Sequence, residues 1–204
     1  MKQNYTHLVL VLDKSGSMGH LQQATIEGVN SLVAAQKDIP GTITTSLYTF
    51  DGNVQEVKNF DLLTTWNYVP SGSTALLDAV AEAITKEGER LSAKAEQDRP
   101  DRVVFVIITD GEENTSKVAK LEDVKNTVKH QQDIYKWQFV FLGANIDAFA
   151  AGSKMNFAAV NSRQFVATPD GVRAAYCTTS QSLGSYRTGV TKTVDMTGPD
   201  AVNP

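Results

Sequence analysis

The sequence predicts a Rossmann-like, doubly wound α/β fold: a mostly parallel six-stranded sheet with one antiparallel edge strand and helices on both faces. Two strongly apolar runs, Leu8–Leu12 and Val103–Thr109, are typical of strands that are buried on both faces. Strand-like segments alternate along the chain with segments of helical periodicity, which favours a parallel sheet covered by helices. The pair Asp51-Gly52 between two strand-like segments predicts a tight hairpin, and therefore one antiparallel strand.

The first half of the chain supplies three of the expected strands and two long helices. The expected elements are a strand at Leu8–Leu12, a helix from about His20 to Lys37, a strand at Thr42–Phe50, an antiparallel return at Val54–Phe60 and a helix over roughly Ala75–Ala95. Thr74 stands directly before the second helix, and its hydroxyl is of the type that caps helices. Thr74 is therefore a candidate N-cap, and capping would leave a second lone pair of its hydroxyl free for another contact.

The second half continues the alternation. The expected elements are a strand at Val103–Thr109, a helix at Leu121–Gln132, a strand at Trp137–Leu142, a short helix at Ile146–Lys154, a strand near Gln164–Ala167 and a last helix to about Leu183. Thr168 and Pro169 are the expected N-cap and first residue of that last helix. We expect one domain over residues 1–187 and a flexible tail over 188–204, which is polar and contains Gly198-Pro199.

Composition limits the classes of function. The 204 residues, with 41% hydrophobic and 21% charged residues, suit one globular domain with a sizeable core. The net charge of -4 argues against non-specific binding to nucleic acid or to an anionic membrane. The N-terminal stretch lacks a cleavage motif for export, and we expect a cytoplasmic protein. Cys177 is the only cysteine, which fits a reducing compartment, and we expect it to be a buried apolar residue.

Acidic and hydroxyl side chains gather in three segments of the sequence. Asp13-Lys14-Ser15-Gly16-Ser17 and Thr109-Asp110-Gly111 each follow an apolar strand, and Ser71-Gly72-Ser73-Thr74 precedes a helix. In open α/β sheets, ligands bind beyond the carboxyl ends of the strands, so neighbouring strands would bring Asp13 and Asp110 together. The set offers only oxygen ligands, with no imidazole and no thiolate, and hard cations such as Mg²⁺ prefer oxygen.

These segments resemble the three loops of the metal-ion-dependent adhesion site of von Willebrand factor A domains, whose pattern is Asp-x-Ser-x-Ser, then Thr, then Asp. The resemblance spans roughly residues 6–167 and is greatest to intracellular bacterial or phage single-domain members. It implies metal ligation by Asp13, Ser15, Ser17, Thr74 and Asp110. The two serines would bind Mg²⁺, or Mn²⁺ or Ca²⁺, directly, and the other three would bind it directly or through water. Ser73 departs from the family, where many relatives have glycine.

The resemblance implies a non-enzymatic module that binds a protein partner through an Asp or Glu carboxylate offered to the metal. From the net charge we expect no nucleic acid or membrane partner. Loops around Trp66–Ser73 and Gly111–Ser116 would supply further contacts. One alternative is a Mg²⁺-dependent phosphoryl-transfer enzyme, but Ser15 stands where such enzymes have a second acid. Another is a nucleotide-binding domain, but neither glycine-rich phosphate-binding motif occurs.

Five residues near these segments have two interpretations each. Asp78 lies one turn after Thr74 and is expected to be a structural residue near the site rather than a direct ligand. Glu112 and Glu113 either add negative potential or belong to a solvated loop, and the solvated loop is favoured. Trp66 and Tyr68 are either exposed recognition aromatics or residues packed over the sheet edge.

Overall fold

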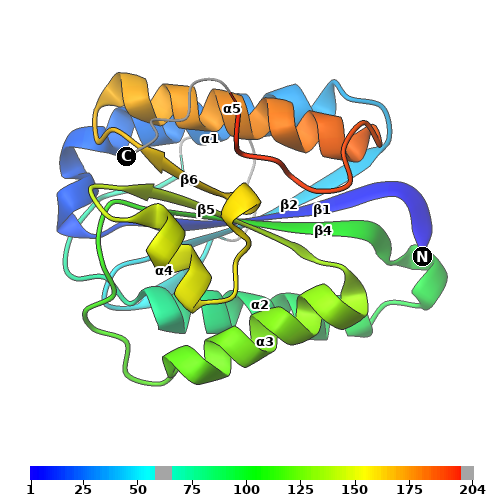
Figure 1. Cartoon of the computed structure of the whole chain (residues 1–204), viewed down its shortest axis with the longest axis horizontal. Helices are drawn as coiled ribbons and strands as arrows, with labels where there is room; N and C mark the ends of the chain where they lie inside the picture. Colours follow the sequence, from blue (N-terminus) through cyan, green and yellow to red (C-terminus); the bar gives the residue numbers. More distant parts are fainter. Residues whose placement is uncertain (58–65, 199–204) are drawn as a thin grey trace.

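The computed structural model describes residues 1–57 and 66–198. Over these residues a six-stranded sheet lies between two layers of helices (Figure 1). The strands are β1 Lys2–Asp13, β2 Thr42–Phe50, β3 Val54–Glu56, β4 Pro100–Thr109, β5 Gln138–Ala144 and β6 Ser162–Phe165. The helices are α1 Gln22–Lys37, α2 Leu76–Ser92, α3 Leu121–Tyr135, α4 Ala148–Lys154 and α5 Pro169–Arg187, with 3₁₀ turns η1 Gly16–Leu21, η2 Glu96–Asp98 and η3 Ala159–Asn161.

The strand order is β3-β2-β1-β4-β5-β6, and β3 pairs antiparallel with β2 at one edge while the other pairs are parallel. The predicted fold class is confirmed, and so is the placement of the two apolar strands side by side at the centre. Leu12 of β1 lies opposite Ile108 of β4. β1 pairs in parallel with β2 on one side and with β4 on the other, so the strand order changes direction beside β1. In open α/β sheets, ligands bind at the carboxyl ends of the strands at such a point.

Side chains of β1 alternate between two separate cores. Leu8, Leu10 and Leu12 pack with α1 and α5, whereas Val9 and Val11 pack with α2 and α3 on the other face. All five side chains are fully buried, which explains why the sequence of this strand shows no polar alternation. Within the described residues, no helix is long and apolar enough to cross a membrane.

The described part of the expected flexible tail, residues 188–198, packs against the domain, and that expectation is wrong for these residues. Val194 is fully buried and Met196 is 1% exposed, and both belong to the core beneath α1 and α5. Side chains from η3 and β6 hold the backbone: the Asn161 amide donates to the Val194 carbonyl at 2.7 Å, and Arg163 donates to the Met196 carbonyl at 3.1 Å. Burial of these two apolar side chains, together with the hydrogen bonds to their carbonyls, docks an otherwise polar segment.

Other boundaries differ in smaller ways. The expected first helix is preceded by the 3₁₀ turn η1, so regular α-helix begins only at Gln22. The return strand β3 ends at Glu56, and residues 58–60 of the expected strand lie outside the described residues. Cys177 is exposed on α5, contrary to the expectation of a buried residue. Thr168 caps α5 as predicted, because its side chain accepts a hydrogen bond from the Gly171 amide.

Candidate metal site

The carboxyl ends of β1 and β4 bring the first and third segments together. Asp13 is the last residue of β1 and is fully buried. Its Oδ2 accepts a hydrogen bond of 2.5 Å from the hydroxyl of Thr109, the last residue of β4. Asp110, which follows Thr109, is also buried. Two carboxylates therefore share one edge of the sheet, as the apolar strands before them predicted.

The loop after β1 turns its hydroxyls toward Asp110. Asp13 Oδ1 accepts a hydrogen bond of 2.7 Å from the Ser15 amide, which closes a tight turn. The Ser15 and Ser17 hydroxyls lie 3.1 Å apart, and the Ser17 hydroxyl donates to Asp110 Oδ1 at 2.6 Å. A continuous chain of polar contacts thus runs through Asp13, Ser15, Ser17 and Asp110.

Thr74 comes to the same place from the second segment. It is 3% exposed. A Cβ atom built on Gly111, the neighbour of Asp110, would lie 3.4 Å from the Thr74 hydroxyl oxygen. The Asn114 side chain accepts from the Thr74 amide at 3.0 Å, and the Gly16 amide donates to the Gly72 carbonyl at 3.1 Å. The loops after β1 and β4 therefore hold the second segment from both sides.

The expectation that Thr74 caps α2 is wrong. The N-cap residue is Ala75, and no side chain of the N-cap position accepts a hydrogen bond. The free amides of the first turn are satisfied from the loop after β4: Glu113 accepts from the Leu77 amide at 2.8 Å, and the Ser116 hydroxyl accepts from the Asp78 amide at 3.0 Å. The Thr74 hydroxyl is consequently not used by the helix.

Asp78 braces the same loop from the helix side. Its carboxylate accepts hydrogen bonds from three consecutive amides, those of Lys117, Val118 and Ala119, at 2.8, 3.1 and 2.7 Å. Burial alone would raise the pKa of Asp78, but these hydrogen bonds outweigh it and lower the pKa. Asp78 has the structural position expected from the sequence. Glu113, expected in a solvated loop, is instead half-buried and hydrogen-bonded, whereas Glu112 is exposed.

The two aromatic residues of the loop before Thr74 are packed rather than presented to a partner. Trp66 is 7% exposed and Tyr68 is 1% exposed, and their ring centroids lie 5.1 Å apart. The Tyr68 hydroxyl donates to the backbone carbonyl of Asp13 at 2.5 Å. Burial raises the pKa of this phenol, and the nearby Asp13 carboxylate raises it further, so it stays a hydrogen-bond donor.

The hairpin between β2 and β3 also supports the site, which the sequence did not suggest. Lys14 forms an ion pair of 3.0 Å with Asp51, and both side chains are largely buried. The Asp51 carbonyl accepts from the Ala75 amide at 2.8 Å, and the Lys14 carbonyl accepts from the Ser71 amide at 2.8 Å. Burial acts to raise the pKa of Asp51, but the hydrogen bond and charge of Lys14 lower it overall. Lys14 and Asp51 thus join the hairpin to two of the candidate loops.

The polar atoms at this edge fit a hard cation. Asp110 Oδ2 is buried and has no hydrogen-bond partner among the described residues. Within residues 1–57 and 66–198, no basic side chain forms an ion pair with Asp13 or Asp110. A buried, unpaired carboxylate oxygen is costly without a cation. Burial raises the pKa of Asp13, and repulsion from Asp110 adds to the rise. A divalent ion would relieve both costs.

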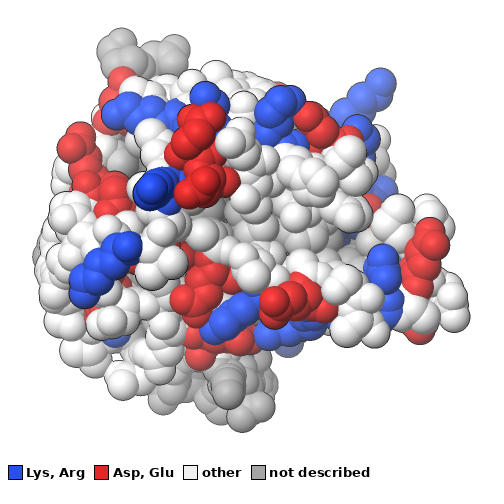
Figure 2. Space-filling view, turned by 90° about the horizontal axis from the view of Figure 1, so that it is seen from below, with Lys and Arg blue, Asp and Glu red and all other residues white. Residues whose placement is uncertain are grey.

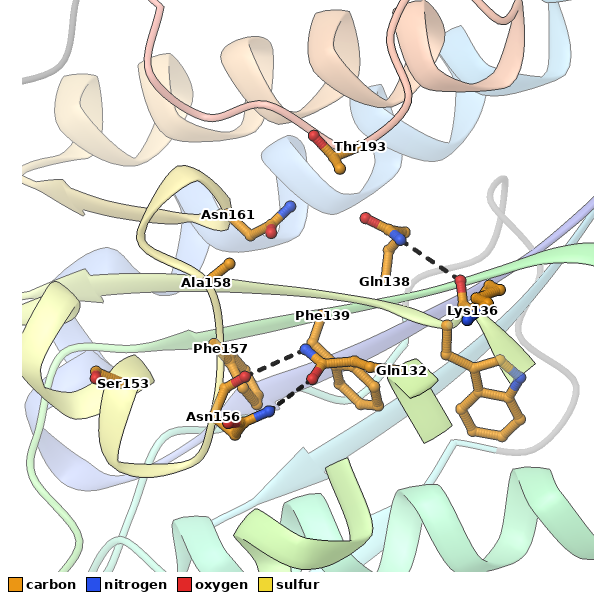
Figure 3. Close-up of a pocket in the computed structure, with 11 residues that line it drawn as sticks. Gln132, Lys136, Gln138, Phe139, Ser153, Asn156, Phe157, Ala158, Asn161 and Thr193 are labelled. Carbon is orange, nitrogen blue, oxygen red and sulfur yellow. Dashed lines mark hydrogen bonds between the residues drawn. The ribbon is translucent and has the colours of Figure 1, made fainter. Parts of the chain in front are cut away.

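Three cavities lined by described residues lie away from this edge. One of about 460 Å³ lies at the amino end of β5, where side chains of α3, β5 and the segment after α4 face one another (Figure 3). The amides of Gln132 and Asn156 contact each other across it at 2.8 Å, so their hydrogen-bonding groups are partly satisfied. None of its lining residues carries a carboxylate.

On the face formed by α2 and α3, acidic and basic side chains are interspersed (Figure 2), with pairs such as Lys129–Asp133 at 2.6 Å.

A scan against protein-family models and a search of curated protein sequences found no match. Solved structures do match. Proximal thread matrix protein 1 from the mussel byssus, in a structure with a zinc-occupied metal-ion-dependent adhesion-site motif, aligns with 90% of this chain and 47% of its own, at a TM-score of 0.62 and 12% identity. The von Willebrand factor domain of the type V pili tip protein Mfa5 from Porphyromonas gingivalis also matches. The alignment covers 87% of this chain and 94% of that domain, with a TM-score of 0.59 and 11% sequence identity.

A third match is the ArnB paralog VWA2 from Sulfolobus acidocaldarius, with 85% of this chain and 44% of that one aligned, a TM-score of 0.53 and 17% identity. This chain therefore spans less than half the length of the archaeal and mussel proteins and nearly all of the pilus domain. At such identities the likeness establishes the architecture, which agrees with the strand order and helix layers described above. The chain has the von Willebrand factor A fold.

Proposed function

We propose that the chain is a non-enzymatic, divalent-cation-dependent protein-binding module. One observation carries the proposal: a buried carboxylate oxygen, Asp110 Oδ2, has no partner among the described residues, beside two serine hydroxyls and a second buried carboxylate. The residues that would hold the ion are Asp13, Ser15, Ser17, Thr74 and Asp110. The match to a structure of the mussel protein with a zinc-occupied motif supports it by analogy of fold.

The two serines and Asp13 have different tasks in this proposal. Ser15 and Ser17 are the direct ligands, since their hydroxyls already lie 3.1 Å apart. Asp13 is held by the Ser15 amide and the Thr109 hydroxyl, so it orients the loop and contributes charge from a fixed position. When bound, a Mg²⁺, Mn²⁺ or Ca²⁺ ion would carry an incompletely neutralised charge, which a partner's Asp or Glu carboxylate could pair with.

The supporting contacts favour a preformed site. Glu113 and Ser116 cap α2, Asp78 fixes the loop that follows Asp110, and Lys14 pairs with Asp51 beneath the first loop. Because these contacts are complete in the protein itself, little ordering would be needed when a partner binds. A phosphoryl-transfer enzyme is less well supported, because Ser15 stands where such an enzyme has its second acid, and its hydroxyl lies beside that of Ser17.

The experiment is a binding measurement on an identified protein partner in Mg²⁺ and in EDTA. We expect chelation to abolish binding while the circular dichroism spectrum of the fold is kept. Thr74→Ala should weaken partner binding, since α2 does not use the Thr74 hydroxyl and its fold should tolerate the change. Thr85→Ala on the exposed face of α2 is the control. Equal affinity in Mg²⁺ and EDTA would contradict the proposal.

A further inference from the structure

Eight large hydrophobic residues of the described part of the chain are exposed. The exposed large hydrophobics are Met1, Val69, Val118, Leu121, Ile134, Tyr135, Val166 and Val190. Three valines, Val69, Val118 and Val166, lie in different loops at the carboxyl edge of the sheet, the edge of the candidate metal site. Single exposed apolar residues are ordinary on a protein surface. Three valines on three loops that are hydrogen-bonded to the candidate site can offer apolar contacts to a ligand bound there.

Hydrogen bonds of residues before and after Val69 in the sequence attach its loop to Asp13 and Lys14. The residue before it, Tyr68, donates its hydroxyl to the Asp13 carbonyl at 2.5 Å. Two residues after it, the Ser71 amide donates to the Lys14 carbonyl at 2.8 Å. Between these anchors the Val69 side chain is 58% exposed. Its position beside the first candidate loop is therefore set by the backbone rather than by packing of the side chain itself.

Val118 is fixed in the same way to the helix that follows Thr74. Its amide and the amides on either side of it donate to the carboxylate of Asp78, in the first turn of α2. The Val118 side chain is 87% exposed, so it has no packing role within the described protein. Val118 is thus an exposed valine on a backbone that is hydrogen-bonded to Asp78, one helical turn after Thr74.

Val166 is linked to Ser17 through His20. The His20 ring lies 2.9 Å from the Ser17 carbonyl oxygen and 3.1 Å from that of Ala167, the residue after Val166. The Val166 carbonyl also faces the start of α5 so closely that a Cβ atom on Gly171 would lie 2.0 Å from it. The Val166 side chain is nevertheless 54% exposed.

We propose that Val69, Val118 and Val166 are the specificity-determining residues of this face, and that they select a protein segment whose acidic residue is flanked by apolar side chains. The inference rests on the proposed function, because the acidic residue is what the metal site would take. Valine has a single flexible side-chain torsion, and the three backbones are already fixed. When the three valines contact the apolar residues that flank the partner's acidic residue, apolar surface is removed from water. The cost in side-chain conformational entropy is small.

The test uses selection from a displayed library of random linear peptides on the whole protein in Mg²⁺. The expected winners carry Asp or Glu with Val, Leu, Ile or Phe next to it. Synthetic versions should bind Val69→Ser, Val118→Ser or Val166→Ser about five- to tenfold more weakly than wild type, because each change removes two methyl groups from a contact. Val190→Ser is the matched control: this valine is 77% exposed but follows α5 at the opposite edge, and its variant should bind as wild type does.

The outcomes separate the two proposals. Metal-dependent acidic peptides with polar or charged neighbours, together with valine variants that bind like Val190→Ser, would overturn this inference and leave the proposed function intact. Peptides that bind equally well in EDTA, or a selection without any metal-dependent binder, would overturn the proposed function and this inference with it. Melting curves of the four serine variants show whether a loss of binding comes from loss of the fold.

Discussion

The hydroxyl of Tyr68 donates a hydrogen bond of 2.5 Å to the backbone carbonyl of Asp13, across 55 residues of sequence. Since Asp13 also orients the first candidate loop, this bond joins the packing of the core to the geometry of the site. Tyr68→Phe should lower the free energy of unfolding by about 1 kcal/mol, because a buried carbonyl loses its donor. Urea unfolding measures it, and Mg²⁺ affinity should fall as well. Tyr135→Phe, at a tyrosine that is 55% exposed, should change neither quantity.

The glycines of two helices are predicted to respond to alanine in opposite directions. Gly28 of α1 faces the ring of Tyr176 on α5, and a Cβ atom there would lie 2.2 Å from the ring. Gly28→Ala should therefore destabilise the protein by about 1–3 kcal/mol, because α1 and α5 must move apart. Gly88 of α2 has nothing within 4 Å of an added Cβ, and Gly88→Ala should stabilise by up to about 1 kcal/mol. Thermal or urea unfolding of both variants tests the close approach of α1 and α5.

The docked segment after α5 should contribute to stability. Met196 is 1% exposed in the core beneath α1 and α5. Met196→Ala should cost about 2–5 kcal/mol in urea unfolding, as is usual for truncation of a buried methionine. Val190→Ala, in the exposed start of the same segment, should change stability by no more than about 0.5 kcal/mol. Equal stability of the two variants would mean that residues 188–198 do not stay docked in solution.

A buried polar network beneath α2 predicts a dependence of stability on pH. The Glu87 carboxylate of α2 contacts His7 of β1 at 3.0 Å, Tyr48 of β2 at 2.9 Å and Arg90 at 2.6 Å. Burial alone would raise the pKa of Glu87, but the hydrogen bond and charge of His7, with hydroxyls of Ser46 and Tyr48, lower it to about 2.

Because the folded-state pKa lies below the unfolded value of 4.5, this stabilisation is complete above about pH 4.5 and is lost as the pH falls toward 2. Its size is on the order of 3 kcal/mol, since one pKa unit corresponds to about 1.4 kcal/mol. Unfolding free energies measured between pH 2 and 7 should show a smaller acid loss in Glu87→Gln than in Glu89→Gln, which changes an exposed neighbour. Parallel pH profiles for these two variants and wild type would refute the role of Glu87.

Continuous apolar runs predicted the central strands of the sheet. β1 and β4 are buried on both faces, and each therefore reads as a continuous apolar run whatever its partner. The same runs located Asp13 and Asp110, since each acid stands where such a run ends. Asp13 and Asp110 lie at the same edge of the sheet because β1 and β4 are neighbouring parallel strands.

Contacts between distant loops could not be predicted from the sequence. The capping of α2 by Glu113 replaced the expected cap by Thr74, because a local hydroxyl and a distant carboxylate compete for the same amides and tertiary packing decides. The Lys14–Asp51 ion pair likewise depends on how the hairpin lies over the first loop. Val194 and Met196 were missed because two apolar residues in a polar segment are too short a pattern to predict docking, which depends on the side chains of η3 and β6 that hold this segment.

Titration calorimetry with Mg²⁺, and separately with Mn²⁺, tests the metal site most directly. The account predicts one saturable site in the wild type. It also predicts a loss of at least about tenfold in affinity in Asp110→Asn, because the amide keeps the shape of the side chain but removes the charge beside Ser17. Asp123→Asn, at an exposed acid in the first turn of α3, should bind as wild type does. Absence of binding in the wild type, or undiminished binding in Asp110→Asn, would contradict a metal site at this edge.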